Sequence, residues 1–248
     1  MTGKPPIRIA MWSGPRNLST ALMYAFGNRP DCACWDEPFY AFYLKQSGVD
    51  HPLREDVMAA GETSFGRVVE RCLGPVPEGK PVFYQKHMTH HMLAGFDRSW
   101  VLGLTNAFLI RAPERVIASY SRKRQTVTLR DIGFLEQCEI FRMVADRLGA
   151  APPVIDADDL LADPRGTLSR LCADLGTRFS DEMLRWPAGP RDYDGLWARH
   201  WYGAVWRSTG FAAEPTSEPE LPQHLRRLAD EARHYYERMH CFSRTEQT

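Results

Sequence analysis

Short apolar runs alternate with longer amphipathic stretches over most of the chain. The runs have the length and the side chains of buried strands, and the stretches between them repeat apolar residues at helical spacing. Such alternation predicts parallel strands joined by helical crossovers. The predicted strands cover residues 7–12, 32–35, 82–85, 107–110 and 154–156.

Boundary residues support helices between and after these strands. Gly27 is a typical stop for the helix after the first strand, and Pro113 suits the first turn of the helix after the fourth. Asp163 is predicted to cap another helix, with Pro164 at its first position. Longer helices are predicted over residues 53–73 and 131–149, and a last one from the helical spacing of Leu221, Leu225, Leu228, Ala232 and Tyr235.

Together these elements predict a single α/β domain, a parallel β-sheet flanked by helices. Its core would comprise residues 5–180, and a helical C-terminal cap residues 181–248. A chain of 248 residues is long enough for one such domain. Ligands of open parallel sheets bind beyond the carboxyl ends of the strands. The loops that follow the first four strands are therefore the expected site.

Composition excludes several classes of protein. The 31 Lys and Arg residues balance 31 Asp and Glu residues, so neither a nucleic-acid nor a membrane partner is expected from net charge. No apolar run is long enough to cross a bilayer, and the first residues lack the features of a secretory signal. The six cysteines show no zinc-type spacing and suit reduced thiols. These features predict a cytoplasmic protein and leave its oligomeric state open.

Two stretches have the character of anion-binding turns. Residues 13–20, SGPRNLST, follow the first strand, and Arg16 adds a positive charge to the N–H groups of a helix N-terminus. The stretch lacks the Gly-Lys-Ser/Thr of the usual ATP-binding loop. Arg111 closes the fourth strand, and Ser119 follows eight residues later in the next helix. Two such turns are suited to a ligand that is anionic at both ends.

In these stretches the chain resembles the sulfotransferases that use adenosine 3′-phosphate 5′-phosphosulfate, PAPS. Their first phosphate loop commonly reads Pro-Lys/Arg-Ser-Gly-Thr-Thr. Residues 15–20 match it at the proline, the basic residue and both hydroxyls, and depart from it at Leu18. Arg111 and Ser119 match the family's pair for the 3′-phosphate. Residues 159–164, DLLADP, are similar to a segment that many bacterial members carry after a core strand.

The resemblance implies a fold, an activity and a donor site. The fold is the three-layer arrangement of the P-loop nucleoside-triphosphate hydrolases. The activity is transfer of a sulfuryl group from PAPS to a hydroxyl, or an amine, of a small-molecule acceptor, with no metal expected. The residues implied for the 5′-phosphosulfate are Pro15, Arg16, Asn17, Ser19 and Thr20, and those for the 3′-phosphate are Arg111, Ser119 and, from a late basic segment, Arg207 and Ser208.

Catalysis by such an enzyme needs cations at the leaving oxygen and a base for the acceptor. Arg16 and Lys86 are the predicted cations. Glu37, which follows the second strand, is the first choice of base, because several relatives that act on sugars or tyrosine use a glutamate. His90 is the second choice, since residues 86–91, KHMTHH, resemble the Lys-Thr-His segment of cytosolic members. The histidines lack a further carboxylate or cysteine in their pattern, so they do not predict a metal site.

Two other interpretations remain open at this stage. A small-molecule kinase would also use a phosphate loop after the first strand, although it has no need of the Arg111 and Ser119 pair. A non-catalytic nucleotide-binding protein of the same fold would keep both turns and lack a base.

Overall fold

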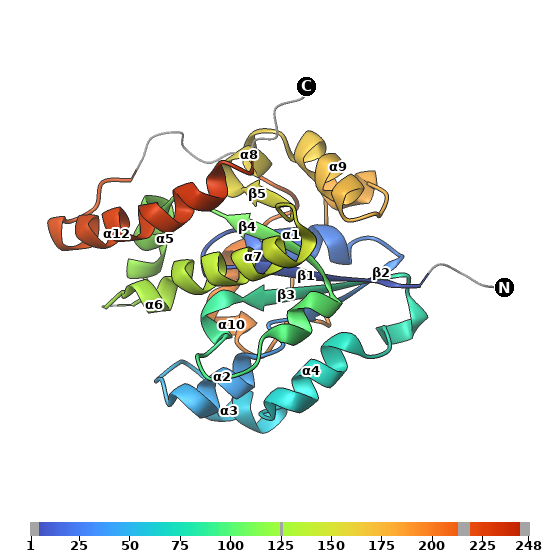
Figure 1. Cartoon of the computed structure of the whole chain (residues 1–248), viewed down its shortest axis with the longest axis horizontal. Coiled ribbons are helices and arrows are strands. Elements are labelled where there is room, and N and C mark those ends of the chain that lie inside the picture. Colours follow the sequence, from blue (N-terminus) through green and yellow to red (C-terminus); the bar gives the residue numbers. More distant parts are fainter. Residues whose placement is uncertain (1–4, 125, 213–218, 244–248) are drawn as a thin grey trace.

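The computed structural model describes residues 5–124, 126–212 and 219–243. Within them a parallel sheet of five strands has the order β2-β3-β1-β4-β5 (Figure 1). The predicted fold class is thereby confirmed. The strands are β1 (Ile7–Ser13), β2 (Cys32–Asp36), β3 (Val82–Met88), β4 (Thr105–Ile110) and β5 (Val154–Asp156).

The alternation of side chains along β1 explains why the sheet is covered on both faces. Ile9 and Met11 point into one apolar cluster, and Ala10 and Trp12 point into another. The first cluster contains residues of α1 (Ser19–Gly27) and α9 (Pro164–Asp174). The second contains residues of α2 (Tyr40–Ser47), α4 (Phe65–Leu73) and α7 (Phe134–Leu148). Helices on both faces of a central sheet give the three layers that were predicted (Figure 1).

Two predicted helices are each broken in the structure. Residues 53–73 form α3 (Arg54–Ala60) and then α4, and residues 131–149 fall into α6 (Leu129–Ile132) and α7. Gly133 ends α6 because its backbone has a φ of 67°, a left-handed conformation that glycine adopts at little cost. The predicted cap of α9 is confirmed, since the Asp163 side chain accepts a hydrogen bond of 2.9 Å from the backbone N–H of Gly166.

The end of β3 was predicted too early. All seven residues of the strand are buried, including Gln85, Lys86 and His87. Polar residues at these positions indicated the end of a strand, yet the register continues to the pair Ser13 and Met88. Lys86 therefore lies within β3, between β1 and β2, and not in the loop that follows.

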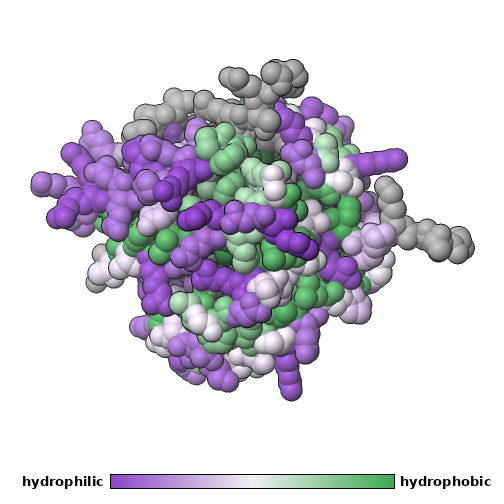
Figure 2. All heavy atoms as spheres, viewed as in Figure 1, coloured by the Kyte–Doolittle hydropathy of each residue, from purple (hydrophilic) through white to green (hydrophobic). Residues whose placement is uncertain are grey.

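The expected cap consists of two parts that lie in different places. Residues 186–206, which include α10 (Ala198–Trp201) and α11 (Gly203–Trp206), pack into the same cluster as α1. The long helix α12 (Gln223–His240) instead packs on α5 (Pro113–Ser121) and α7. Figure 2 shows mostly hydrophilic residues on the outer side of α12. The remaining elements are η1 (Pro77–Gly79), η2 (Thr89–His91), η3 (Ser99–Gly103), α8 (Ala157–Ala162) and η4 (Asp181–Leu184).

Candidate active site

The carboxyl ends of the central strands open into a cavity of about 400 Å³. A volume of this size is within the range of small-molecule sites. The cavity brings together most of the residues predicted from sequence: Pro15, Arg16, Asn17, Ser19, Thr20, Glu37, Lys86, His90, Arg111, Ser119 and Ser208. Arg207 is exposed and is not among the lining residues.

The first turn has an unusual backbone. Arg16 and Leu18 both have positive φ angles, of 64° and 63°. Leu18 is in the left-handed region that a glycine adopts readily. The loop therefore keeps the backbone conformation that suits the family's glycine, although a leucine stands there. Between them Asn17 is buried, and its side-chain amide donates to the backbone carbonyl of Leu109 at 3.3 Å. The turn is thereby fixed to β4.

The second turn meets the first directly. Arg111 donates from Nη1 to the backbone carbonyl of Arg16 at 3.0 Å. Arg16 in turn donates from Nε to Oγ of Ser119 at 2.8 Å. Two basic turns whose arginines are 95 residues apart in sequence therefore line one cavity at the carboxyl ends of the strands.

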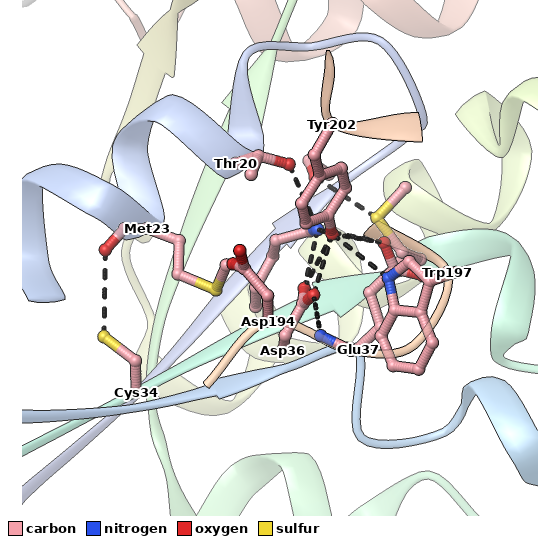
Figure 3. A network of polar contacts seen from close by, with 12 residues as sticks. Thr20, Met23, Cys34, Asp36, Glu37, Asp194, Trp197 and Tyr202 are labelled. Atoms are coloured by element: carbon pink, nitrogen blue, oxygen red, sulfur yellow. Dashed lines mark hydrogen bonds and ion pairs between the residues drawn. The ribbon is translucent and has the colours of Figure 1, made fainter. Parts of the chain in front are cut away.

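A buried ion cluster borders the cavity, and Figure 3 shows its polar contacts. Lys86 is 1% exposed, and its Nζ donates to Oδ1 of Asp36 at 2.8 Å and to Oε1 of Glu37 at 2.9 Å. It also contacts the Tyr202 hydroxyl and Oγ1 of Thr20, the latter at 3.3 Å. One ammonium thus faces two carboxylates in a place where water does not screen the charges.

Burial shifts the protonation of this cluster. Burial is the main cause that raises the pKa of Glu37, and Asp36 adds to it, while Lys86 opposes it. Burial by itself would lower the pKa of Lys86, but the two carboxylates outweigh it and hold that pKa above its usual value. Lys86 is therefore protonated at neutral pH, and Glu37 is a stronger base than an exposed carboxylate.

Sequence reasoning gave no role to Asp36 or Tyr202. The Tyr202 hydroxyl donates to Oδ2 of Asp36 at 2.8 Å, and the indole N–H of Trp197 donates to the same hydroxyl at 3.1 Å. Asp36 also accepts from the backbone N–H of Gly195 at 3.1 Å. These bonds attach the segment around α10 to the end of β2. The acidic pair of Asp36 with Glu37 after a strand was the one signal in the sequence.

The histidines of the KHMTHH segment separate into two groups. His90 and His91 line the cavity from η2, whereas His87 points away from it and stacks on Trp12 at 4.5 Å. Burial lowers the pKa of His90 to about 3, and it lowers that of His91 well below the usual value. Both imidazoles are neutral at pH 7. His91 stacks on Tyr40 at 5.0 Å and on Tyr43 at 4.7 Å.

Residues 204–212 contribute both polar and apolar side chains to the cavity wall. Ser208 lines the cavity, but its hydroxyl donates to the carbonyl of Val205 at 2.7 Å and accepts from the indole of Trp186 at 3.2 Å. Both its bonds are therefore local. Apolar lining residues of the same region and of α8 are Leu161, Ala204, Val205, Phe211 and Ala212.

A sequence profile of the sulfotransferase domain matches residues 7–243. The chain belongs to the sulfotransferase family. Family membership supports a transferase, in agreement with the two turns that share this cavity. Among the described residues, the chain has no group of three or more histidine, cysteine or acidic residues placed to hold a metal ion. The described helices also include none that is long and apolar enough to span a bilayer.

The chain is similar to two curated plant proteins. It is 37% identical over 214 residues to branched-chain-amino-acid aminotransferase-like protein 2 of Arabidopsis thaliana, and 38% identical over 208 residues to protein 1 of that name. The alignments cover 86% and 84% of the chain, but only 37% of either plant protein. The chain thus corresponds to about a third of each of these relatives.

Solved sulfotransferases share the fold. The sulfotransferase domain of the Synechococcus PCC 7002 olefin synthase has a TM-score of 0.52 at 17% identity, with 93% of this chain and 96% of that one covered. A sulfotransferase from Alicyclobacillus acidocaldarius has a TM-score of 0.55 at 12% identity, with 98% and 96% covered. At such identities the likeness concerns the fold.

Proposed function

We propose that the protein transfers a sulfuryl group from PAPS to a small-molecule acceptor. The observation that carries this proposal is the contact between the two basic turns at one cavity. PAPS carries anionic groups at the 3′ and the 5′ position of its ribose, and the hydrogen-bond donors of the two turns fit them. Among the described residues, the Lys and Arg side chains that line the cavity are Arg16, Lys86 and Arg111.

Each turn has a separate task in this proposal. Residues 15–20 hold the 5′-phosphosulfate with the N–H groups at the start of α1 and with Arg16. Arg111 and Ser119 hold the 3′-phosphate, since a planar guanidinium suits phosphate oxygens. Arg207 and Ser208 stay a prediction for the same phosphate; in the structure the Ser208 hydroxyl donates to the carbonyl of Val205, and Arg207 is not among the lining residues.

The chemical step needs no covalent enzyme intermediate. The acceptor atom forms a bond to sulfur and loses its proton to the base. The bond between sulfur and the bridging oxygen breaks, and adenosine 3′,5′-bisphosphate leaves with the electron pair. Arg16 and Lys86 stabilise the charge that develops on that oxygen. Arginine stays protonated, so Arg16 acts by its charge and not as an acid.

Glu37 is the better of the two candidate bases. A general base works best when its pKa is near the working pH. Burial moves the pKa of Glu37 upward, toward neutrality, whereas it moves that of His90 to about 3. At that pKa His90 binds a proton too weakly to take one from an acceptor.

The proposal is tested by calorimetry with adenosine 3′,5′-bisphosphate. We expect Arg111→Ala to weaken binding by about 1.5–3 kcal/mol, because a charged hydrogen-bond donor is lost. Arg115→Ala is the matched control: Arg115 follows on α5, does not line the cavity and pairs with Asp158. It should bind the nucleotide like the wild type. Nucleotide binding that is indifferent to Arg111→Ala would refute the assignment.

Turnover of PAPS distinguishes an enzyme from a binding protein. Glu37→Gln should retain affinity for the bisphosphate and lose transfer by about a hundredfold or more, the usual contribution of a general base. A wild-type protein that binds the bisphosphate tightly and transfers to no acceptor would favour the non-catalytic interpretation.

A further inference from the structure

A short gap separates Glu37 from an imidazole that sequence reasoning did not select. Oε2 of Glu37 and Nε2 of His91 are 4.0 Å apart, and both residues line the cavity. The distance is too long for a direct hydrogen bond. A single oxygen atom at about 2.8 Å from each would fit between them.

His91 is built to hold such an atom. Its side chain is 1% exposed, and neither ring nitrogen has a hydrogen-bond partner among the described residues. Buried polar atoms are usually paired, so unpaired ones indicate a ligand or a water. The ring is held in place by stacking on Tyr40 with an angle of 5° between the planes, and on Tyr43 with an angle of 26°.

The charge on Glu37 determines which way the bonds run. His91 is neutral because burial holds its pKa well below the usual value. A neutral imidazole carries one N–H, and the nearby carboxylate favours its position on Nε2. The pair then offers one donor from His91 and one acceptor from Glu37. A hydroxyl group complements both, since it accepts one hydrogen bond and donates another.

An aliphatic amine fits this place poorly. At neutral pH it is an ammonium ion, which has three donors and no lone pair for attack on sulfur. Contact with the Glu37 carboxylate would stabilise that charged form, even though the Lys86 ammonium on the other oxygen of Glu37 opposes it. The carboxylate that removes a proton from a hydroxyl would therefore keep an amine protonated and unreactive.

Resting on the proposed sulfuryl transfer, we infer that the acceptor atom is a hydroxyl oxygen bound between Glu37 and His91, so that the enzyme sulfates alcohols or phenols in preference to aliphatic amines. His91 donates to the oxygen and fixes it, and the hydroxyl proton passes to Glu37 as the oxygen bonds to sulfur. Aromatic rings that line the cavity beside this position would contact the body of the acceptor: Tyr40, His51, Trp197, Trp201 and Tyr202.

The rings form a continuous surface. Tyr40 contacts Trp197 edge to face at 4.9 Å and bonds through its hydroxyl to Nδ1 of His51 at 2.8 Å, and His51 lies 6.4 Å from Trp201. Such a wall suits an apolar or aromatic acceptor body. Matched acceptors for a test are therefore 2-phenylethanol with 2-phenylethylamine, and benzyl alcohol with benzylamine.

The test compares kcat/KM for each alcohol and its amine with PAPS as donor. The wild type should prefer the alcohol by at least about a hundredfold. His91→Phe keeps a flat ring for stacking and removes the donor. It should lower kcat/KM for alcohols about ten- to hundredfold and leave the affinity for adenosine 3′,5′-bisphosphate unchanged. His87→Phe is the control, because it makes the same change at a buried histidine outside the cavity.

A double-mutant cycle measures the coupling between Glu37 and His91, which a purely structural role of His91 would not produce. If Glu37 and His91 hold one oxygen, the effects of Glu37→Gln and His91→Phe should be strongly non-additive. Equal transfer to alcohols and amines, or alcohol turnover unaffected by His91→Phe, would overturn this inference and leave the proposed function standing. A wild-type protein that does not bind adenosine 3′,5′-bisphosphate, or that transfers to no acceptor, would refute the proposed function and this inference with it.

Discussion

Three residues of the cavity hold backbone conformations that side chains rarely adopt. Arg16, Leu18 and Glu37 have φ angles of 64°, 63° and 42°. A left-handed conformation costs about 1–2 kcal/mol per residue for amino acids with a Cβ. Leu53 and Glu78 also have positive φ angles and lie outside the cavity. The concentration of strain in the first turn and at the end of β2 is consistent with a site that the surrounding structure holds in shape.

Substitution of Leu18 tests whether its backbone conformation matters for the donor. We expect Leu18→Gly to bind adenosine 3′,5′-bisphosphate like the wild type, because glycine keeps the left-handed backbone without strain. Leu18→Val also shortens the side chain, but a β-branched residue tolerates that conformation poorly. It should bind about fivefold more weakly than Leu18→Gly, corresponding to about 1 kcal/mol. Calorimetry on the two variants makes the comparison, and equal affinities would show that the φ of residue 18 is unimportant.

Single residues were predictable where a local motif identified them. Arg16 lies in the turn after β1 and Arg111 directly follows β4, and the structure places them in contact. Asp36 and Tyr202 depend on contacts across about 166 residues of chain, and no local pattern specifies such a pairing. His91 could not be singled out from sequence, because the six residues 86–91 contain three histidines. Only the folded structure shows which of them face the cavity.

Among the elements, the break between α6 and α7 has the clearest effect on the site. The apolar spacing of residues 131–149 indicates one helix, because periodicity alone does not report a left-handed residue. A Cβ at Gly133 would lie 2.5 Å from Oγ1 of Thr89 and 3.1 Å from the backbone N of His90. Thr89 also donates to the carbonyl of Gly133 at 2.8 Å. The break thus supports η2, which carries His90 and His91.

Gly133→Ala should therefore displace η2 and, with it, the histidines that line the cavity. It combines backbone strain with a clash, so we expect a loss of stability of about 2 kcal/mol or more and a lower turnover. Gly149→Ala is the matched control: its φ is 66°, but a Cβ there would have no atom within 4 Å. It should lose only about 1 kcal/mol, from strain. Denaturant unfolding of both variants measures the difference, and equal losses would argue against contact with η2.

Strands were easier to predict than their ends. Buried apolar runs located all five strands, since each is flanked by polar or turn-forming residues. In β3 the same logic failed, because Lys86 is buried beside Asp36 and Glu37 and so satisfies its charge inside the sheet. Buried charges are tolerated when they are paired. A prediction that treats every lysine as exposed therefore places the end of such a strand too early.

At the scale of the molecule, the order of the strands explains why distant turns form one site. β1 lies between β3 and β4, so the loops after these three strands emerge side by side. The site therefore combines the first turn, the end of β3 with Lys86, and the turn of Arg111, and no long connection is needed to bring them together. The C-terminal half of the cavity wall was less predictable, because residues 186–212 have little regular structure and are placed by packing on α1.

Buried histidines should make the stability of the whole molecule depend on pH. Burial lowers the pKa of His51 to about 4 and those of His87 and His90 to about 3. An unfolded histidine has a pKa of about 6.5, so the unfolded chain takes up more protons below that pH. The stability is then complete above about pH 6.5 and is lost as the pH falls toward the folded values. Glu37, Glu136, Asp156 and Asp174 act in the opposite direction, because burial raises their pKa values.

We expect the free energy of unfolding to be several kcal/mol lower at pH 5 than at pH 7, since four buried histidines, His91 among them, outweigh the buried carboxyl groups. Urea denaturation at the two pH values measures the difference. His87→Phe removes one buried imidazole and leaves its partners in place. The difference between the two pH values should therefore shrink by about 2 kcal/mol, at about 1.4 kcal/mol for each pH unit. A variant with the same pH dependence as the wild type would show that His87 is protonated, or accessible to water, in the folded protein.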